Sequence, residues 1–199
     1  MIALHMKKQF TLILSLIFSI LSLSAKAQED IDNIKKWHAE IEGNQALKST
    51  TFSLENDGEE IGLKRFMNEK GEVVKVRLFA GGDHSSLDDI YYYKNGLLFF
   101  VIRTKNGWQF SDKKDKDGNP KTIDSAFQSR LYFQRAKILK ILVKNVSSEN
   151  AEAIDGMLAK AENREVIVNE EHKWIMNLAY AAKFVSSKSE LETLSLLGR

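Results

Sequence analysis

The segment from Gly81 to Asp89 brings a histidine, two serines and three carboxylates onto one short connection. A histidine can act as general base for a serine nucleophile when a carboxylate orients its ring. The candidates for these roles are His84, Ser85, Ser86 and Asp88. A catalytic set is recognised by geometry and not by adjacency, so the same residues also fit a turn whose polar side chains bind their own backbone. The chain contains no P-loop, GxSxG or HExxH motif.

A second polar segment, Lys113 to Asp124, partly matches an EF-hand calcium loop. Asp115, Asp117 and Asp124 stand at loop positions three, five and twelve, where oxygen ligands are needed. Position one, which requires a carboxylate, is occupied by Lys113, and no helical pair is expected around the loop. A solvated hairpin loop is therefore the competing interpretation, and we expect no cofactor.

The segment around Asn95-Gly96 is apolar on both faces of a predicted hairpin. If Asn-Gly forms a two-residue turn, Tyr93 lies opposite Leu98, Tyr92 opposite Phe99, and Tyr91 opposite Phe100. In one interpretation both faces are buried, and in the other one face is a recognition surface for a ligand or partner. The candidate residues of such a surface are Tyr91, Tyr92, Tyr93, Phe99 and Phe100.

Turn signals recur at nearly even spacing between Thr50 and Val143. Stretches that are rich in valine, isoleucine, phenylalanine and tyrosine are separated by four predicted turns, at Asp57-Gly58, Lys70-Gly71, Asn95-Gly96 and Asn106-Gly107. This pattern predicts an antiparallel β-meander of about eight strands. The predicted strands are residues 50–55, 60–67, 72–79, 88–94, 97–104, 108–111, 127–134 and 137–143.

Helical periodicity flanks this meander on both sides. Residues 30–42 carry apolar side chains at spacings of three and four, and His38 on that stripe is expected at the edge of a core. A C-terminal helical pair is predicted at residues 147–162, capped by Ser147 and Ser148, and at 169–185, with His172 facing solvent. With both C-terminal helices on one face of the sheet, residues 28–199 form a single α+β domain.

Three of the predicted hairpins are similar to one another. Each places an aromatic residue four or five positions before the turn residue and an aliphatic strand after it, in Phe66–Leu78, Tyr92–Arg103 and Tyr132–Val143. These hairpins resemble MORN-type hairpin repeats and a group of uncharacterised bacterial secreted proteins that join a signal peptide to a β-meander. The resemblance covers roughly residues 60–143, supports the fold and carries over no functional residue. The third unit has Ala136 where the others have glycine.

The first 27 residues have the order of a secretory signal peptide. Two lysines precede an apolar run from Phe10 to Leu23, and Ala25 and Ala27 occupy the small-residue positions that signal peptidase requires. The run is short for a membrane span, so we expect cleavage after Ala27 and no stable membrane anchor. Residues 1–5 resemble an upstream start or a tag.

The composition supports an exported protein that does not bind nucleic acid. None of the 199 residues is cysteine, so disulfides, zinc thiolate sites and a lipidated cysteine are excluded. Loss of the three lysines of the predicted signal changes the formal net charge from +2 to −1. Such a chain lacks the basic character of a nucleic-acid-binding domain. We expect it in the periplasm or outside the cell.

Two functional hypotheses follow. The first is a non-catalytic envelope module that binds a protein, a peptide or an apolar ligand. The second is an envelope hydrolase that uses the His84 loop. An acidic side chain orienting His84, with a serine hydroxyl in reach and a cleft alongside, favours the hydrolase. A His84 without such partners favours the binding module.

Overall fold

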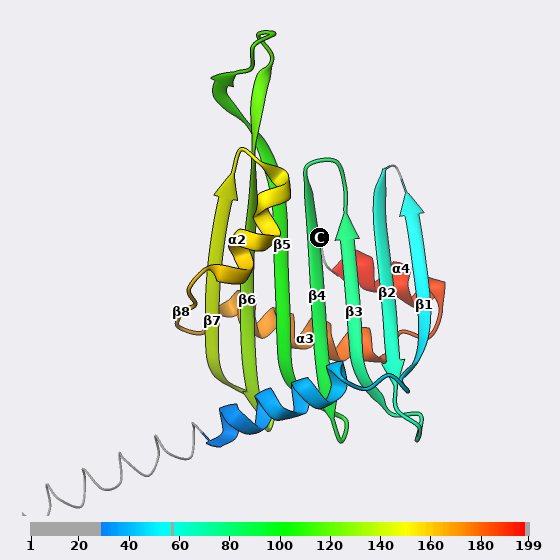
Figure 1. The fold of residues 1–199 in the computed structure, drawn as a ribbon. Coiled ribbons are helices and arrows are strands. Elements are labelled where there is room, and N and C mark those ends of the chain that lie inside the picture. The colour runs from blue at the N-terminus through cyan, green and yellow to red at the C-terminus, as the bar shows by residue number, and fades with distance from the viewer. Residues whose placement is uncertain (1–28, 57, 198–199) are drawn as a thin grey trace, which may run out of the picture.

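The computed structural model describes residues 29–56 and 58–197, so the predicted signal peptide lies outside the described residues. Eight strands form one sheet in which each strand pairs antiparallel with its neighbour in sequence (Figure 1). They are β1 (Lys48–Asn56), β2 (Glu59–Met67), β3 (Val73–Gly81), β4 (Ser85–Lys94), β5 (Leu97–Lys114), β6 (Pro120–Gln134), β7 (Lys137–Ser148) and β8 (Arg164–Glu165). The predicted α+β fold with a β-meander is confirmed.

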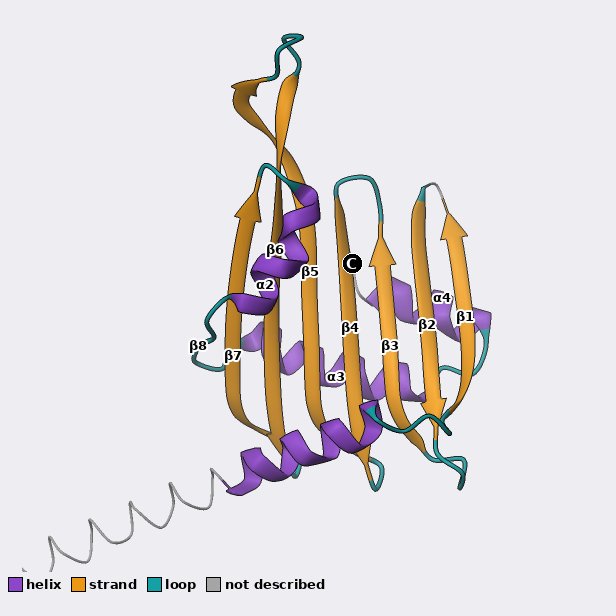
Figure 2. Ribbon diagram, in the orientation of Figure 1, coloured by secondary structure: helices purple, strands orange, loops and turns teal. Residues whose placement is uncertain are grey.

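Helices lie on both faces of this sheet (Figure 2). The helix α1 (residues 29–42) and α2 (Ile154–Lys160), which follows the 3₁₀ turn η1 (Ala151–Ala153), cover what we call the front face. The back face carries α3 (Glu170–Phe184) and α4 (Lys188–Leu197). The prediction that the helices share one face is therefore wrong, and α4 was not predicted. Within the described chain, every helix is too short or too polar to cross a membrane.

The larger core lies between the back face and α3. Period-two alternation directs Leu63, Val76, Tyr91 and Tyr93 of successive strands to this side, where all four are almost completely buried. The predicted apolar stripe of α3 packs against them. It consists of Ile175, Leu178, Ala179 and Ala182. The Tyr93 hydroxyl donates to the Ala179 carbonyl and so ties the hairpin to the helix.

A second core lies between α1 and the front face. Ile34 packs with Tyr92, Phe99 and other aromatic side chains of the sheet. The His38 ring meets Tyr92 edge to face, with 4.8 Å between ring centroids, so it lies at the edge of a core as expected. Burial lowers the pKa of His38, because the charged imidazolium loses its water.

The predicted register of the central hairpin holds for only two pairs. Lys94 pairs with Leu97 and Tyr93 with Leu98, but Tyr92 then pairs with Phe100 because Phe99 is an extra residue in a β-bulge. Tyr91 consequently lies opposite Val101 and not Phe100. Both Phe99 and Phe100 join the core under α1.

The same irregularity occurs in all three of the hairpins that resemble one another. The register shifts directly after Phe66 in β2, after Tyr92 in β4 and after Tyr132 in β6. The aromatic residue in each sequence unit therefore marks the start of the same bulge.

The predicted turn at Asn106-Gly107 is absent. Gly107 lies inside β5 and pairs with Ser85 on one side and Ser125 on the other, so predicted strands 97–104 and 108–111 are one strand. β6 correspondingly begins at Pro120 and not at residue 127. The extended parts of β5 and β6 project beyond the other strands as a hairpin arm (Figure 1).

The first C-terminal helix begins later than predicted. Ser147 and Ser148 pair with Ser125 and Asp124 and complete β7, so they do not cap a helix. Asn150 caps the 3₁₀ turn η1 that leads into α2, because its side chain accepts a hydrogen bond from the Glu152 amide.

His172 is buried and does not face solvent. Its ring closes a capping box at the start of α3, in which Nδ1 accepts from the Asn169 amide at 3.1 Å.

Candidate functional site

The hairpin aromatics are core residues. The exposed fractions of Tyr91, Tyr92, Tyr93, Phe99 and Phe100 lie between 0% and 5%. α3 covers one side of the hairpin and α1 covers the other. The structure agrees with the interpretation in which both faces of the hairpin are buried. The interpretation in which one face is an exposed recognition surface is therefore wrong.

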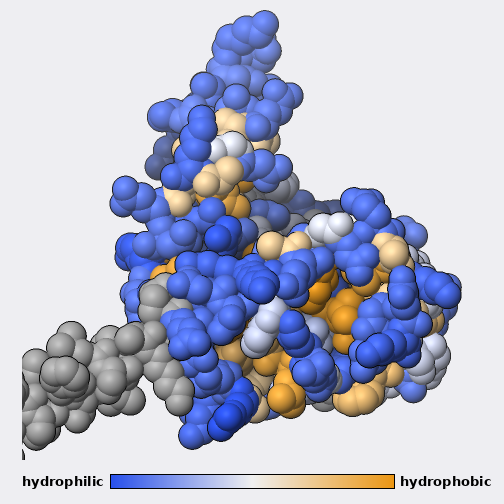
Figure 3. All heavy atoms as spheres, turned by 60° about the horizontal axis from the view of Figure 1, so that its bottom comes forward, coloured by the Kyte–Doolittle hydropathy of each residue, from blue (hydrophilic) through white to orange (hydrophobic). Residues whose placement is uncertain are grey.

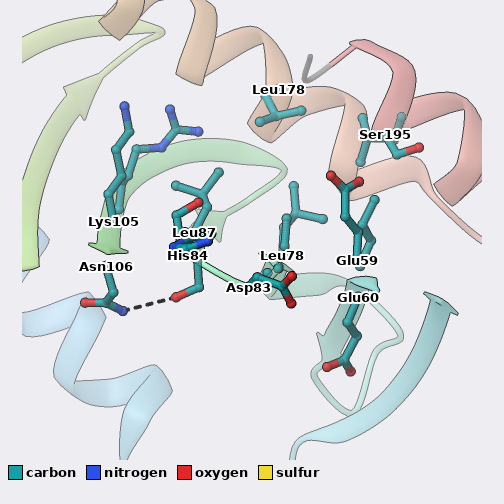
Figure 4. A pocket seen from close by; sticks show the side chains of 18 of the residues that line it. Glu59, Glu60, Leu78, Asp83, His84, Leu87, Lys105, Asn106, Leu178 and Ser195 are labelled. Carbon is teal, nitrogen blue, oxygen red and sulfur yellow. Dashed lines mark hydrogen bonds between the residues drawn. The ribbon is translucent and has the colours of Figure 1, made fainter. Parts of the chain in front are cut away.

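A cavity of about 720 Å³ lies on the back face, where α3, α4 and the β3–β4 connection meet the sheet (Figure 4). This volume lies within the range of roughly 300–1,000 Å³ that is typical of small-molecule sites. The apolar lining comes from three strands and both helices. It consists of Ile61, Leu78, Ala80, Leu87, Trp174, Leu178, Leu191 and Leu194. The polar lining includes His84 and Ser86 of the segment singled out by its chemistry.

A buried ion pair adjoins the cavity. Arg103, which lines the cavity, donates from Nε to Asp89 at 2.7 Å and from Nη2 to the second oxygen of the same carboxylate. The exposed fractions of the two side chains are only 2% and 0%. The Tyr91 hydroxyl donates to Asp89 as well. The three side chains form one buried polar cluster.

The pKa values of this cluster reflect its surroundings. Burial, followed by the neighbouring charge of Asp89, raises the pKa of Tyr91 well above its usual value, so the phenol stays protonated. Burial opposes the charge of Arg103, but the hydrogen bonds and charge of Asp89 outweigh it and raise the pKa of the guanidinium. The Trp174 ring covers the guanidinium, with 5.1 Å between the ring centroid and Cζ.

A second, more exposed ion pair lies at the same side of the cavity. Lys105 follows Arg103 by two positions on β5 and therefore points to the same face. Its Nζ lies 2.7 Å from Glu171 at the start of α3, and about half of each side chain is exposed. The hydrogen bond from Lys105 lowers the pKa of Glu171.

The catalytic candidates are not joined by hydrogen bonds. The Asp88 carboxylate binds Arg77 through two hydrogen bonds, at 2.8 and 2.9 Å. The Ser86 hydroxyl accepts from Asn106 at 3.4 Å, and the His84 ring packs on Trp108 with 4.2 Å between centroids. Within residues 29–56 and 58–197, no hydrogen bond links His84 to a carboxylate, to Ser85 or to Ser86. The structure thus brings a cleft to His84 but not an orienting acid and a nucleophile.

Trp108 fixes the connection that carries His84. Its indole Nε1 donates to the Asp83 carbonyl at 2.8 Å, and its backbone amide donates to the His84 carbonyl at 3.0 Å. Trp108 lies at the base of the projecting arm. The arm therefore holds one wall of the cavity in place.

Two of the calcium-loop candidates, Asp115 and Asp117, lie at the far end of this arm, and the third, Asp124, lies at its base. The Asp115 carboxylate accepts from the amides of Asp117 and Asn119, and these bonds to backbone lower its pKa. Asp124 lies in β6, opposite Trp108. The described residues contain no group of three or more side chains suited to hold a metal. Hydrophilic atoms cover the tip of the arm (Figure 3), which agrees with a solvated loop.

The sequence-based reasoning missed the buried ion pair. Asp89 alternates onto the same face as Tyr91 and Tyr93, and a carboxylate on a buried face requires a partner. A regular hairpin would place Ile102 opposite Asp89. The bulge at Phe99 shifts the register by one and brings Arg103 there instead. The alternation of Asp89 with Tyr91 and Tyr93 was the available signal that Asp89 is buried. Its partner Arg103 could not be identified, because the bulge is not visible in the sequence.

Comparison with known proteins gave no further assignment. No protein-family model matches this chain, and neither the curated proteins nor the solved structures contain a significant match.

Proposed function

We propose that the protein is an exported, non-catalytic binding module that holds a small, largely apolar ligand in the cavity between the back face and the helices α3 and α4. The observation that carries this proposal is the cavity itself, whose apolar wall comes from both the sheet and the helices. Burial of an apolar ligand surface against such a wall contributes roughly 25 cal/mol per Å².

The arrangement of polar groups supports a binding role. Charged and neutral polar side chains line part of a cavity whose larger part is apolar, and in small-molecule sites a few such groups fix the orientation of the ligand. The geometry around His84 offers less support to the hydrolase alternative, because Asp88 is engaged by Arg77.

Export is part of the same proposal. The signal-like order of residues 7–27 predicts cleavage between Ala27 and Gln28 and delivery to the periplasm or the medium. Mass spectrometry of the exported chain tests it, and an intact amino terminus in a membrane fraction would replace the signal peptide with an anchor.

The cavity is tested by filling it. Ala80 lines the cavity from β3, so Ala80→Trp should abolish binding of an apolar, environment-sensitive dye. Thr51→Trp is the matched control, because residue 51 is exposed on the front face of β1. Melting temperatures of both variants show whether the sheet remains folded. Native-like dye binding by a folded Ala80→Trp variant would disprove the cavity as the binding site.

A further inference from the structure

Arg103 has more hydrogen-bond donors than its protein partners use. A guanidinium carries five N–H groups. Two of the hydrogen bonds go to Asp89, and the Tyr91 hydroxyl can accept at most one more. Because the side chain is 2% exposed, water can reach the remaining N–H groups only from the cavity that it lines. The apolar cavity therefore has donors for an anionic group in its wall.

Maintenance of this ion pair is costly for the fold. Removal of two charges from water is not repaid in general by their attraction, and apolar side chains of similar volume are often as stabilising or more so. Asp89 and Arg103 nevertheless lie buried on the back face beside core residues such as Tyr91 and Val101. A role in recognition explains why a guanidinium is held there.

Lys105 adds a second cationic group that a ligand can engage. Its partner Glu171 is about half exposed, and exposed ion pairs of this kind contribute only about 0–1 kcal/mol. A carboxylate on a ligand can therefore displace Glu171 from Lys105 at little cost. The hydrogen bonds that it gains are charge-assisted and stronger than neutral ones.

The charged side chains are unevenly distributed along the cavity. Figure 4 shows Lys105 and Asn106 at one end, Glu59 and Glu60 at the other, and Leu87, Leu78 and Asp83 between them. An anion is accommodated at the Lys105 end, away from Glu59 and Glu60, where it competes with Glu171 for Lys105. An apolar body extending from that end meets the leucines of the sheet and helices.

We infer that the ligand is an amphipathic carboxylate, with its carboxylate at Arg103 and Lys105 and its apolar body against Leu87, Leu178 and Leu191. This inference rests on the proposed function, because it names the ligand class for the same cavity.

The test compares three probes with the same twelve-carbon chain on the processed, full-length mature protein. Dodecanoate, dodecan-1-ol and dodecyltrimethylammonium, each below its micelle concentration, are titrated against the cavity-bound dye. We expect dodecanoate to bind about tenfold more tightly than the alcohol, as one or more charge-assisted hydrogen bonds would give. The cationic probe should bind more weakly than either.

Two substitutions with opposite expected effects locate the carboxylate. Lys105→Met should weaken dodecanoate binding about tenfold and leave dodecan-1-ol binding unchanged, since the alcohol does not need the charge. Glu171→Gln should tighten dodecanoate binding severalfold, because it removes the competing carboxylate. Lys121→Met is the matched control, since Lys121 forms a comparably exposed ion pair with Glu149 on the arm, and it should change neither affinity.

The outcomes separate this inference from the proposed function. If no probe and no dye binds, the cavity is not a ligand site and both proposals fail. If dodecan-1-ol or dodecyltrimethylammonium binds as tightly as dodecanoate, the binding module stands and the carboxylate assignment is overturned. Equal effects of Lys105→Met and Lys121→Met also overturn it.

Discussion

Replacement of Arg103 by methionine should destabilise the protein severely. The substitution removes both hydrogen bonds to Asp89 and leaves a carboxylate with 0% exposure beside apolar residues. The loss of one partner from a buried ion pair costs about 3–5 kcal/mol, because the remaining charge is uncompensated. For a chain of this length each kcal/mol lowers the melting temperature by about 2–4 °C. We therefore expect Arg103→Met to melt roughly 6–20 °C below the native protein.

Arg77→Met provides the matched control. Arg77 also contacts an aspartate through two hydrogen bonds, but its side chain is 53% exposed and that of Asp88 is 25% exposed. Exposed pairs contribute about 0–1 kcal/mol, so Arg77→Met should remain close to the native stability. Urea unfolding followed by circular dichroism gives both free energies of unfolding. Equal losses for the two variants would show that burial does not set the value of the Asp89–Arg103 pair.

A triple variant separates the charge from the packing. Asp89→Leu, Tyr91→Phe and Arg103→Met together remove every polar side-chain atom of this cluster, so none of the three positions keeps a polar group without a partner. Apolar replacement of a buried ion pair is often neutral or stabilising. The triple variant should therefore recover most of the stability that Arg103→Met loses. A triple variant as unstable as the single one would refute the reasoning from desolvation.

Three further predictions concern the backbone at Ala136, the buried ammonium of Lys144 and the buried ring of His172. Ala136 has a φ of 62°, so Ala136→Gly should raise the free energy of unfolding by about 0.5–1 kcal/mol in urea unfolding, because glycine adopts positive φ without steric cost. The ammonium of Lys144 is buried and donates to the Leu158 carbonyl near the end of α2, so Lys144→Met should lower that free energy by about 1–3 kcal/mol in the same assay. Burial lowers the pKa of His172 in the folded state below its unfolded value near 6.5, so the unfolded chain binds more protons below that value and stability should fall as the pH drops through it. His172→Gln keeps a capping-box side chain that does not titrate, and the pH dependence of its unfolding midpoint should be shallower, leaving the contribution of His38.

Most of the meander could be predicted because its turns are encoded locally. Asn95 and Gly96 have φ values of 51° and 78°, the positive values that a two-residue hairpin turn requires. Asn106-Gly107 is the same dipeptide, but it lies within β5, where it pairs with β4 on one side and β6 on the other. A dipeptide cannot reveal whether neighbouring strands continue past it. Pairing with two neighbouring strands therefore explains why the turn predicted at Asn106-Gly107 does not form.

The candidate site was harder to predict than the fold. Three of the residues singled out in the His84 segment, His84, Ser85 and Ser86, line the cavity, although nothing in the sequence indicated the cavity itself. The chemistry expected of that segment depended on partners that other strands supply, and Asp88 finds its partner in Arg77. The cavity itself depends on α4, whose Leu191 and Leu194 close it, and this short helix was not predicted.

One inserted residue connects the sequence to the candidate site. The bulge at Phe99 shifts the register of the following part of β5 by one residue. Arg103 and Lys105 therefore both point to the back face, where α3 and the cavity lie. If Phe99 instead paired with Tyr92 in a regular ladder, Ile102 and Thr104 would occupy these places, and the wall of the cavity would lack both cations. The three similar hairpins share the bulge, but the positions that correspond to Arg103 and Lys105 are Leu78 and Ala80 in the first hairpin and Val143 and Asn145 in the third. A repeated backbone irregularity thus gives a charged wall in the central hairpin only, because only there do an arginine and a lysine follow at the right spacing.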